Sequence, residues 1–322
     1  MRVVFFGTPM FSAQILKYLV EKQLDIVAIV TQPDKLQGRH LKLQEPAVKK
    51  VAKELFLTAP ILQPEKISTN TFLEEIEAFK ADIFVVVAFG QIFPTKLLEL
   101  PRLGCVNVHT SLLPKYRGAA PIQRCLMEGE EETGVSVMYM VKALDAGDVL
   151  ATKKIAIDPS MNAETLSIAL CELSKELLYT TLIRLDQGEI VPKPQNPAEV
   201  TYAKKVNPED AEVLWQKDAV EIVRQFRGVS PKPGAWCRLL LRGKETRLKL
   251  IEIAFTQQTG APGDILSYLE DGIVVAAQNG SIKISKLQIE GKKAVEVKEF
   301  IKGYSLKDVS FKLDSSNFDS KS

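Results

Sequence analysis

Strand-like and helix-like segments alternate along the first half of the chain. The strand candidates are short and apolar, and they lie at residues 2–6, 25–30, 82–88, 104–109, 134–140 and 148–157. The segments with the apolar spacing of helices lie at residues 12–21, 45–56, 70–79, 96–100, 119–128 and 162–185. Because strands alternate with helices, the sequence predicts an α/β fold with an open, mostly parallel, Rossmann-like sheet.

The amino-acid composition of the chain changes after residue 188. Four prolines fall among lysines and asparagines between residues 188 and 208, which is typical of a semi-rigid linker. A helix near 219–226 comes next. Five short alternating strands then follow, near 235–241, 247–254, 263–269, 272–277 and 281–289. Five short strands separated by glycine and charged turns predict a small β-barrel of the oligonucleotide-binding (OB) type.

These changes divide the chain into four predicted parts. Its 322 residues are enough for two domains. We expect a catalytic α/β domain at 1–188, a linker at 189–207 and the OB-like barrel at 208–313. The polar tail at 314–322 is expected to be disordered.

The first turn of the predicted sheet decides against a nicotinamide site. A strand, a turn and a helix open the chain, as they do in dinucleotide-binding proteins. The turn, Gly7-Thr8-Pro9, has one glycine, whereas the dinucleotide fingerprint needs three. The sequence therefore favours a tight turn that opens the sheet.

Residues 105–109 place two polar side chains on one face of a predicted strand. Val106 and Val108 alternate with Asn107 and His109, and side chains two residues apart share a face. An amide beside an imidazole suits acyl transfer, because the amide can hold an oxyanion while the imidazole exchanges a proton near neutral pH. A lone histidine is often structural. The position of this one, where a strand ends in a loop punctuated by proline and glycine, favours function.

Composition narrows the class of protein further. Hydrophobic residues make up 46% of the chain and charged residues 25%, as in ordinary globular proteins. The four cysteines form no Cys-x-x-Cys pair, so we expect reduced thiols, no metal site and no nucleophilic role for Cys105. No secretory leader or membrane-length apolar run is present, so we expect a cytoplasmic protein without membrane contact, and a monomer.

Basic residues are locally clustered although the net charge is only +2. Loop 31–46 has no regular apolar pattern and is long for a compact domain, which is typical of functional or disordered loops. The basic residues of interest are Arg39 and Lys42 in this loop, Lys204 and Lys205 in the linker, and Arg238 and Arg242 in the barrel. A solvated charged face and a surface that follows nucleic-acid phosphates are both compatible with these clusters.

Residues 107–118 carry a recognisable motif. They read Asn-Val-His-Thr-Ser-Leu-Leu-Pro-Lys-Tyr-Arg-Gly, which resembles the Asn-x-His-x-Ser-Leu-Leu-Pro-x-x-x-Gly signature of the folate-dependent formyltransferases. Residues 144–148, Leu-Asp-Ala-Gly-Asp, resemble the second half of the same signature. The resemblance implies the formyltransferase fold, 10-formyltetrahydrofolate as formyl donor and a substrate amine as acceptor.

The resemblance also implies a role for each residue of the motif. Asn107 would donate its amide N–H to the developing oxyanion, and His109 would move the proton from the attacking amine to the departing folate nitrogen. Asp145 would orient His109 or an ordered water, and would favour the protonated form of His109. The residues that bind the folate would be Ser111, Leu112, Leu113 and Pro114.

Other parts of the chain indicate which molecule carries the amine that is formylated. The loop after Gln32-Pro33-Asp34 and the basic second domain resemble, end to end, the branch of the family that formylates charged initiator tRNA. The resemblance implies RNA contacts by Arg39, Lys42, Lys204, Lys205, Arg238 and Arg242. Residues 230–236 depart from the family pattern, with Lys232 in place of a tryptophan. Other acceptors, such as glycinamide ribonucleotide or an amino-sugar nucleotide, and a non-catalytic RNA-binding module remain alternatives.

Overall fold

The computed structural model of the chain describes residues 1–37, 42–55 and 57–313, with the backbone alone at residues 37 and 42. Contacts divide the chain into two compact units. Unit 1 comprises residues 1–121, 132–157 and 167–203, and unit 2 comprises residues 122–131, 158–166 and the chain from 204 onward. The predicted disordered tail, 314–322, lies outside the described residues.

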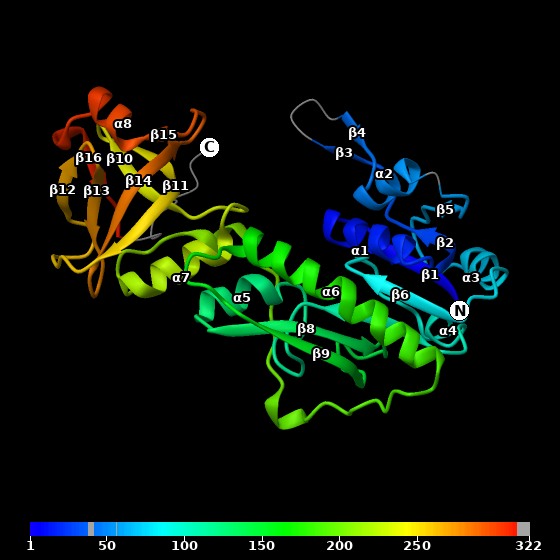
Figure 1. Cartoon of the computed structure of the whole chain (residues 1–322). Helices are drawn as coiled ribbons and strands as arrows, with labels where there is room; N and C mark the ends of the chain where they lie inside the picture. Colours follow the sequence, from blue (N-terminus) through cyan, green and yellow to red (C-terminus); the bar gives the residue numbers. More distant parts are fainter. Residues whose placement is uncertain (38–41, 56, 314–322) are drawn as a thin grey trace. The chain divides into compact units, whose positions relative to one another are not determined.

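Among the described residues, unit 1 is built on a seven-stranded sheet (Figure 1). Its strand order is β5-β2-β1-β6-β7-β8-β9. The strands are β1 (Arg2–Gly7), β2 (Asp25–Val30), β5 (Ile61–Leu62), β6 (Ile83–Val87), β7 (Cys105–His109), β8 (Glu132–Tyr139) and β9 (Val149–Ala156). Neighbouring strands are parallel as far as β7, and β8 and β9 are antiparallel. The predicted open, mostly parallel sheet is confirmed.

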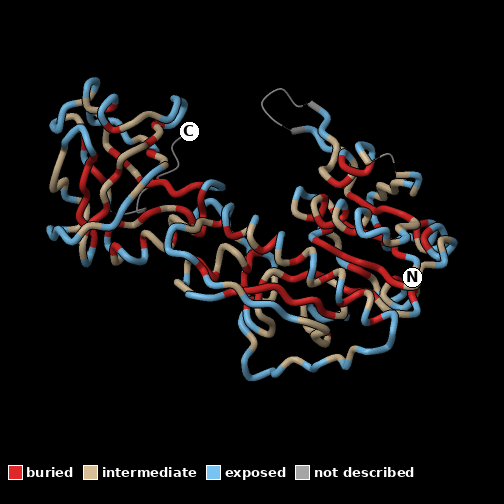
Figure 2. The backbone as a smooth tube through the Cα atoms, in the orientation of Figure 1, coloured by how far each residue is buried: buried red, intermediate tan, exposed pale blue. Residues whose placement is uncertain are grey.

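The predicted helices of the first half are present, with ends shifted by a few residues. They are α1 (Met10–Glu21), α2 (Ala47–Glu54), α3 (Asn70–Glu77), α4 (Thr95–Leu98), α5 (Pro121–Glu128) and α6 (Ala163–Asp186). Figure 2 shows the buried residues concentrated along the central strands. In this core the Phe6 ring centroid lies 5.4 Å from Phe89 and 5.0 Å from Phe93, so aromatic packing anchors the segment after β6.

The loop at 31–46 is more regular than predicted. It contains the short antiparallel pair β3 (Lys35–Gln37) and β4 (Lys42–Gln44). The expectation of no regular structure was wrong here, because strands of three residues with exposed side chains leave no burial pattern in the sequence. Arg39 lies outside the described residues, and Lys42 is placed only by its backbone, at the start of β4.

Residues 189–203 are hydrogen-bonded into unit 1. Val149 and Lys193 exchange backbone hydrogen bonds of 2.8 and 2.9 Å, and a 3-10 turn, η1 (Pro197–Glu199), lies farther along. The division between the units falls after Ala203. The linker at 189–207 therefore stays a prediction, and most of its length is attached to unit 1.

Unit 2 contains a nearly closed antiparallel β-barrel (Figure 1). Its strand order is β12-β13-β14-β11-β10-β16, and β15 pairs with β14. The elements are η2 (Pro208–Ala211), α7 (Ala219–Val229), β10 (Trp236–Leu241), β11 (Lys244–Thr256), β12 (Ile265–Leu269), β13 (Gly272–Ala276), β14 (Ser281–Ile289), β15 (Val295–Glu296), α8 (Val297–Gly303), η3 (Leu306–Asp308) and β16 (Val309–Phe311). The predicted small barrel and its five strands are confirmed. The short strands β15 and β16 were not predicted, because two or three residues are too few for a period-two pattern.

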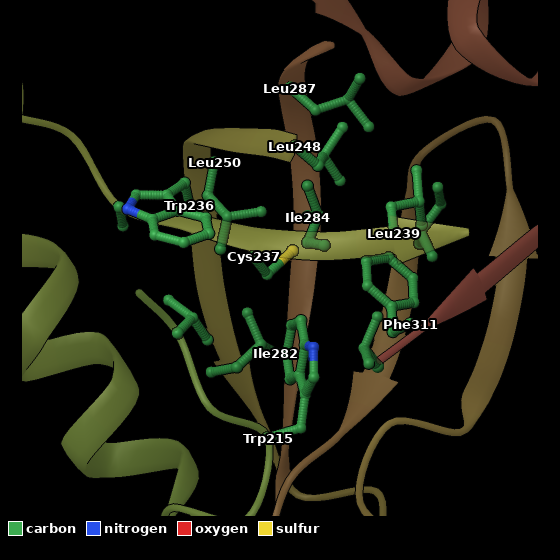
Figure 3. Close-up of a cluster of buried hydrophobic side chains, with 14 of the residues drawn as sticks. Trp215, Trp236, Cys237, Leu239, Leu248, Leu250, Ile282, Ile284, Leu287 and Phe311 are labelled. Atoms are coloured by element: carbon green, nitrogen blue, oxygen red, sulfur yellow. The ribbon is translucent and has the colours of Figure 1, made fainter. Parts of the chain in front are cut away.

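The interior of the barrel is apolar and closely packed. Figure 3 shows side chains from several strands gathered in one cluster, with Trp215, which is fully buried, at the lower end of the view. The Trp215 and Phe311 rings meet edge to face, with centroids 5.3 Å apart. Phe311 belongs to the last strand, so this contact joins the end of the described chain to the barrel core.

Candidate active site

Strand β7 carries two of the predicted catalytic residues, Asn107 and His109, in the interior of the sheet. It pairs with β6 on one side, where Asn107 lies opposite Val86, and with β8 on the other, where His109 lies opposite Ser136. His109 is the last residue of β7, so it stands at the carboxyl end of the strand. Open α/β sheets bind their ligands at such strand ends.

The ring of His109 is held by one backbone contact. The residue is only 6% exposed, and its Nε2 lies 2.8 Å from the carbonyl oxygen of Tyr116. A carbonyl can only accept a hydrogen bond, so Nε2 must carry a hydrogen. In the neutral ring Nδ1 is then the nitrogen that carries no hydrogen and keeps a free lone pair.

Asp145 lies beside this second nitrogen. Its Oδ2 is 3.7 Å from His109 Nδ1 and accepts a 2.7 Å hydrogen bond from the Gly118 N–H. Asp145 has a φ of +48°, in the left-handed region that residues other than glycine rarely adopt. The carboxylate is therefore held against the imidazole by the loop that follows β7, and a proton taken up at Nδ1 would face a negative charge.

A pocket of about 270 Å³ opens beside this cluster. Asn107 and Asp145 both line it, together with residues between 86 and 93 after β6 and between 138 and 145 after β8. Much of the wall is apolar, with Phe89, Ile92 and Met140 among the lining residues. Within the described part of the chain, the half-buried Asn107 amide makes no hydrogen bond, so it is available to a group in the pocket.

The predicted folate-binding segment has a different position. Ser111 is buried, and its hydroxyl donates to the Lys115 carbonyl at 2.6 Å. The Ser136 hydroxyl on β8 accepts from the Leu113 N–H at 3.1 Å and donates to the Ser111 carbonyl at 2.8 Å. Among the described residues that line the pocket, none comes from 111–114. The assignment of Ser111, Leu112, Leu113 and Pro114 to the folate therefore stays a prediction.

The pocket walls at 86–93 and 138–144 were not predicted as part of the site. The available signal was the strand at 82–88 followed by a glycine and a proline, at positions 90 and 94. A buried parallel strand that ends in a glycine-containing turn is a usual place for a ligand. The second wall has no comparable signal, because it comes from the apolar end of β8 and the loop that follows.

The Cys105 thiol lies on the same strand as Asn107 and His109 and is buried. Burial raises the pKa of the Cys105 thiol to about 12, so the thiol stays protonated near neutral pH. In the described ranges, no three His, Cys, Asp or Glu side chains gather closely enough to hold a metal ion. None of the helices in the same ranges is long and apolar enough to cross a membrane.

Arg238 and Arg242, two of the predicted RNA contacts in unit 2, differ in how exposed their guanidinium groups are and in how closely carboxylates pair with them. The Arg238 side chain is 16% exposed and forms ion pairs with Glu212 at 2.7 Å and Glu245 at 3.0 Å. Arg242 is 63% exposed and lies 3.5 Å from Asp308. Paired guanidinium groups must leave a carboxylate before they can bind phosphate, so Arg238 is poorly placed for such a contact.

Lys204 and Lys205 are better placed for a contact with phosphate. Both residues are exposed, and their carbonyls accept hydrogen bonds from Arg124 at 3.0 and 3.2 Å. Their backbone is thereby held, and the described residues include no acidic partner for either ammonium group. Fixed backbone with free cationic side chains is a suitable arrangement for following a phosphate chain.

The loop that presents Asp145 leaves no space for a side chain at Gly147. A Cβ at this position would lie 2.0 Å from the carbonyl oxygen of Tyr139. Gly147→Ala must therefore shift the backbone next to Asp145. We expect the substitution to lower both enzyme activity and the free energy of unfolding, the latter by about 1–3 kcal/mol. Thermal unfolding and turnover of the purified variant measure the two effects.

Gly303→Ala is the matched control, because no atom lies within 4 Å of a Cβ at Gly303. We expect this control to keep the stability and activity of the unsubstituted protein. If Gly147→Ala behaves like the control, the loop is not confined as described.

Comparison with known proteins relates both units of the chain to one family. Residues 1–182 match the family model described as Formyl transferase, and residues 205–305 match that of the formyl transferase C-terminal domain. A methionyl-tRNA formyltransferase from Citrifermentans bemidjiense is 44% identical over 306 residues, which cover 95% of this chain and 94% of the relative. Another from Protochlamydia amoebophila is 38% identical over 312 residues, which cover 97% of this chain and 98% of the relative.

Solved structures share the fold at low sequence identity. The N-formyltransferase from Helicobacter canadensis, in complex with folinic acid and dTDP-3-aminofucose, has a TM-score of 0.66 at 17% identity, over 88% of this chain and 98% of that one. HypX from Aquifex aeolicus, in complex with tetrahydrofolic acid, has a TM-score of 0.62 at 17% identity and covers 94% of this chain. The match spans 47% of HypX, about half its length.

The sheet and the cluster at the end of β7 define an α/β protein in which a histidine and an aspartate meet beside a pocket at a strand end. Both of its units match formyl transferase models, and the relatives named above cover almost its whole length. The chain belongs to the formyl transferase family, a family of enzymes.

Proposed function

We propose that this chain transfers the formyl group of 10-formyltetrahydrofolate to the free amino group of methionyl initiator tRNA, for the initiation of translation. The methionyl-tRNA formyltransferases at 38–44% identity, which match in both units, support this acceptor. The observation that carries the chemistry is the position of His109, whose Nε2 is bonded to Tyr116 and whose Nδ1 faces Asp145 beside the pocket.

The pocket suits part of a folate. Its volume of about 270 Å³ falls below the roughly 300–1,000 Å³ typical of complete ligand sites, so it can hold one ring system of the formyl donor. Apolar walls from Phe89 and Met140 would cover the faces of a flat heterocycle. Ser111, Leu112, Leu113 and Pro114 are proposed to contact the remainder. The folate ligands of HypX and of the Helicobacter canadensis enzyme support a folate donor.

The formyl donor supplies the formyl carbon that the amine attacks. The protein stabilises the negative charge that forms on the formyl oxygen, and it accepts the proton that the amine loses. Attack by the amine drives negative charge onto the formyl oxygen. The unpaired Asn107 amide in the pocket wall can donate to that oxygen, and one such hydrogen bond typically contributes on the order of 10²–10³ in rate.

His109 is assigned the proton transfer. Because Nε2–H is engaged by Tyr116, the nitrogen that accepts a proton from the attacking amine is Nδ1. The resulting imidazolium faces Asp145 at 3.7 Å, and that carboxylate stabilises it until the proton passes to the leaving nitrogen. Asp145 keeps its orientation through the Gly118 N–H.

Lys204 and Lys205 are the best-placed of the proposed RNA contacts. We expect the double substitution Lys204→Ala/Lys205→Ala to weaken binding of charged tRNA and to reduce the slope of log affinity against log salt by about one for each lysine. Binding measured at several salt concentrations gives both quantities. Lys153→Ala, at an exposed position on β9, is the matched control. An unchanged affinity and slope in the double variant would remove the two lysines from the RNA surface.

Arg39, Lys42, Arg238 and Arg242 are the remaining proposed contacts. Arg238 ranks below the others because of its two ion pairs. The proposed substrate takes part in translation, which supports the expected cytoplasmic location and a role without membrane contact. The monomeric state remains a prediction.

The acceptor is tested by direct comparison. Purified enzyme and 10-formyltetrahydrofolate are offered methionyl initiator tRNA, glycinamide ribonucleotide or an amino-sugar nucleotide, and kcat/KM is measured for each. We expect charged tRNA to be preferred by several orders of magnitude, with uncharged tRNA as the control that lacks the amine. Preference for a small acceptor would establish the alternative acceptor. RNA binding without transfer to any acceptor would favour the non-catalytic module.

A further inference from the structure

The chain between α6 and unit 2 runs beside the loop that holds His109. The Arg117 N–H donates to the Thr201 carbonyl at 2.9 Å, and the Ala203 N–H donates to the Arg117 carbonyl at 2.7 Å. Arg117 and Tyr202 form a parallel β-bridge. Residues 201–203 therefore act as a short additional strand along the catalytic loop.

Tyr116 connects this additional strand to the imidazole. Its φ of +60° lies in the left-handed region, where a residue with a side chain needs support from its surroundings. Its N–H donates to the Thr201 hydroxyl at 2.9 Å, and its carbonyl accepts from His109 Nε2 at 2.8 Å. One side-chain hydroxyl thus holds the residue that sets the orientation and the tautomer of His109.

Gln195 connects the same segment to the carboxylate. Its Nε2 donates to the Asp145 carbonyl at 2.9 Å and to the Gly147 carbonyl at 2.7 Å. Its Oε1 accepts from Arg117 Nε at 3.0 Å and Nη2 at 2.8 Å. The amide uses both hydrogens and both lone pairs, so no other side chain of its size could replace it. Asp145, with its φ of +48°, is held by this contact and by Gly118.

Both neighbours of the His109 ring are therefore held from one segment, at Gln195 and at Thr201. We propose that these two residues are positioning residues for the reaction: Thr201 acts through Tyr116 on His109 Nε2, and Gln195 acts through the 145–147 loop on Asp145. The expected effect on the rate of formyl transfer rests on the function proposed above. The expected effect on the tautomer of His109 rests only on the hydrogen bonds of Tyr116 and Thr201.

The kinetic test uses variants that change one group at constant size. Thr201→Val removes the hydroxyl that accepts from Tyr116, and Thr201→Ser keeps it. Gln195→Glu removes both N–H donors and sets a carboxylate against two carbonyls. Thr180→Val, on the exposed side of α6, is the matched control, because its hydroxyl also bonds to a backbone group, the Glu176 carbonyl.

We expect Thr201→Val and Gln195→Glu to lower kcat by about tenfold to a hundredfold, as misplaced catalytic groups do, with KM for both substrates nearly unchanged. Thr201→Ser should restore most of kcat, and Thr180→Val should leave it unaltered. An unchanged kcat in both Thr201→Val and Gln195→Glu overturns the proposal. So does a serine variant as impaired as the valine variant, or an effect on KM alone.

A spectroscopic test separates this inference from the proposed function. The chain has two histidines, so ¹⁵N-labelled histidine gives two ring systems, and His40→Gln assigns them. With the neutral ring we expect His109 in the Nε2–H form in the unsubstituted protein and a mixture of both tautomers in Thr201→Val. An unchanged tautomer in Thr201→Val contradicts the role of Thr201 whatever the enzyme formylates. Failure of the unsubstituted protein to formylate charged tRNA would refute the proposed function and leave this readout intact.

Discussion

Replacing His109 with alanine or glutamine is expected to lower kcat for formyl transfer by about 10²–10⁴-fold, because each variant removes the imidazole to which the proton transfer is assigned. Glutamine can still donate an amide hydrogen toward the Tyr116 carbonyl and partly fills the buried site. It cannot take up a proton. The glutamine variant therefore separates proton transfer from packing, and single-turnover transfer with saturating substrates measures the effect.

The structural controls for these variants are circular dichroism and binding of the folate donor, both of which we expect to be close to those of the unsubstituted protein. The account is contradicted if folded His109→Gln transfers the formyl group at an undiminished rate. In that case His109 would be a structural residue, as a buried lone histidine often is.

Asn107→Asp is expected to be more damaging than Asn107→Ala. The alanine variant loses the amide donor, for which we expect a loss in kcat of about 10²–10³. The aspartate variant keeps the size of the side chain but puts a carboxylate into the pocket where the formyl oxygen gains negative charge. A lower kcat in the aspartate variant than in the alanine variant indicates an electrostatic role for Asn107, whereas the reverse order indicates a packing role. Steady-state kcat and KM for both substrates measure it.

Donor affinity should change little in Asn107→Ala, because the contact strengthens only as charge develops. Equal rates for the alanine and aspartate variants, or a loss confined to KM, would contradict the assignment of Asn107 to the oxyanion.

The strands that carry the site could be predicted from short-range patterns. The apolar run at 82–88 and the alternation of Val106 and Val108 with Asn107 and His109 each appear within a few residues of sequence, and β6 and β7 lie there. The approach of Asp145 to His109 was expected from resemblance alone, because the 35 residues between them have no local pattern that would predict a contact.

The contacts that hold the site could not be predicted. Tyr116 holds His109 with its own backbone carbonyl, which every residue possesses, so its residue type does not mark it in advance. Gln195 uses its side-chain amide, but its partners are the backbone carbonyls of the 145–147 loop, which no sequence pattern points to. Residues 189–203 were predicted to be a linker because they are rich in proline and charged residues. Several of their hydrogen bonds to unit 1 are made by backbone groups and leave no pattern in the sequence. The short pair β3 and β4 was missed for a related reason, since strands of three residues bury too little to show a pattern.

Charge clusters were also incompletely predicted from sequence. Over residues 224–249 the only acidic residue is Glu245, which predicts a strongly basic face. In the fold, Arg238 is also paired with Glu212, and Arg242 lies near Asp308, and both acids come from outside that span. A basic run in sequence therefore indicates a charged surface only after its distant partners are known.

The most direct test of the central claim is one turnover of the chemical step. Enzyme in excess, with 10-formyltetrahydrofolate labelled in the formyl group, is mixed with methionyl initiator tRNA, and the label on the methionine amine is followed with time. The account predicts rapid, stoichiometric labelling by the unsubstituted protein and labelling slower by about 10²–10⁴-fold in His109→Gln. Absence of label on the amine with the unsubstituted protein, or equal rates in both, would contradict it.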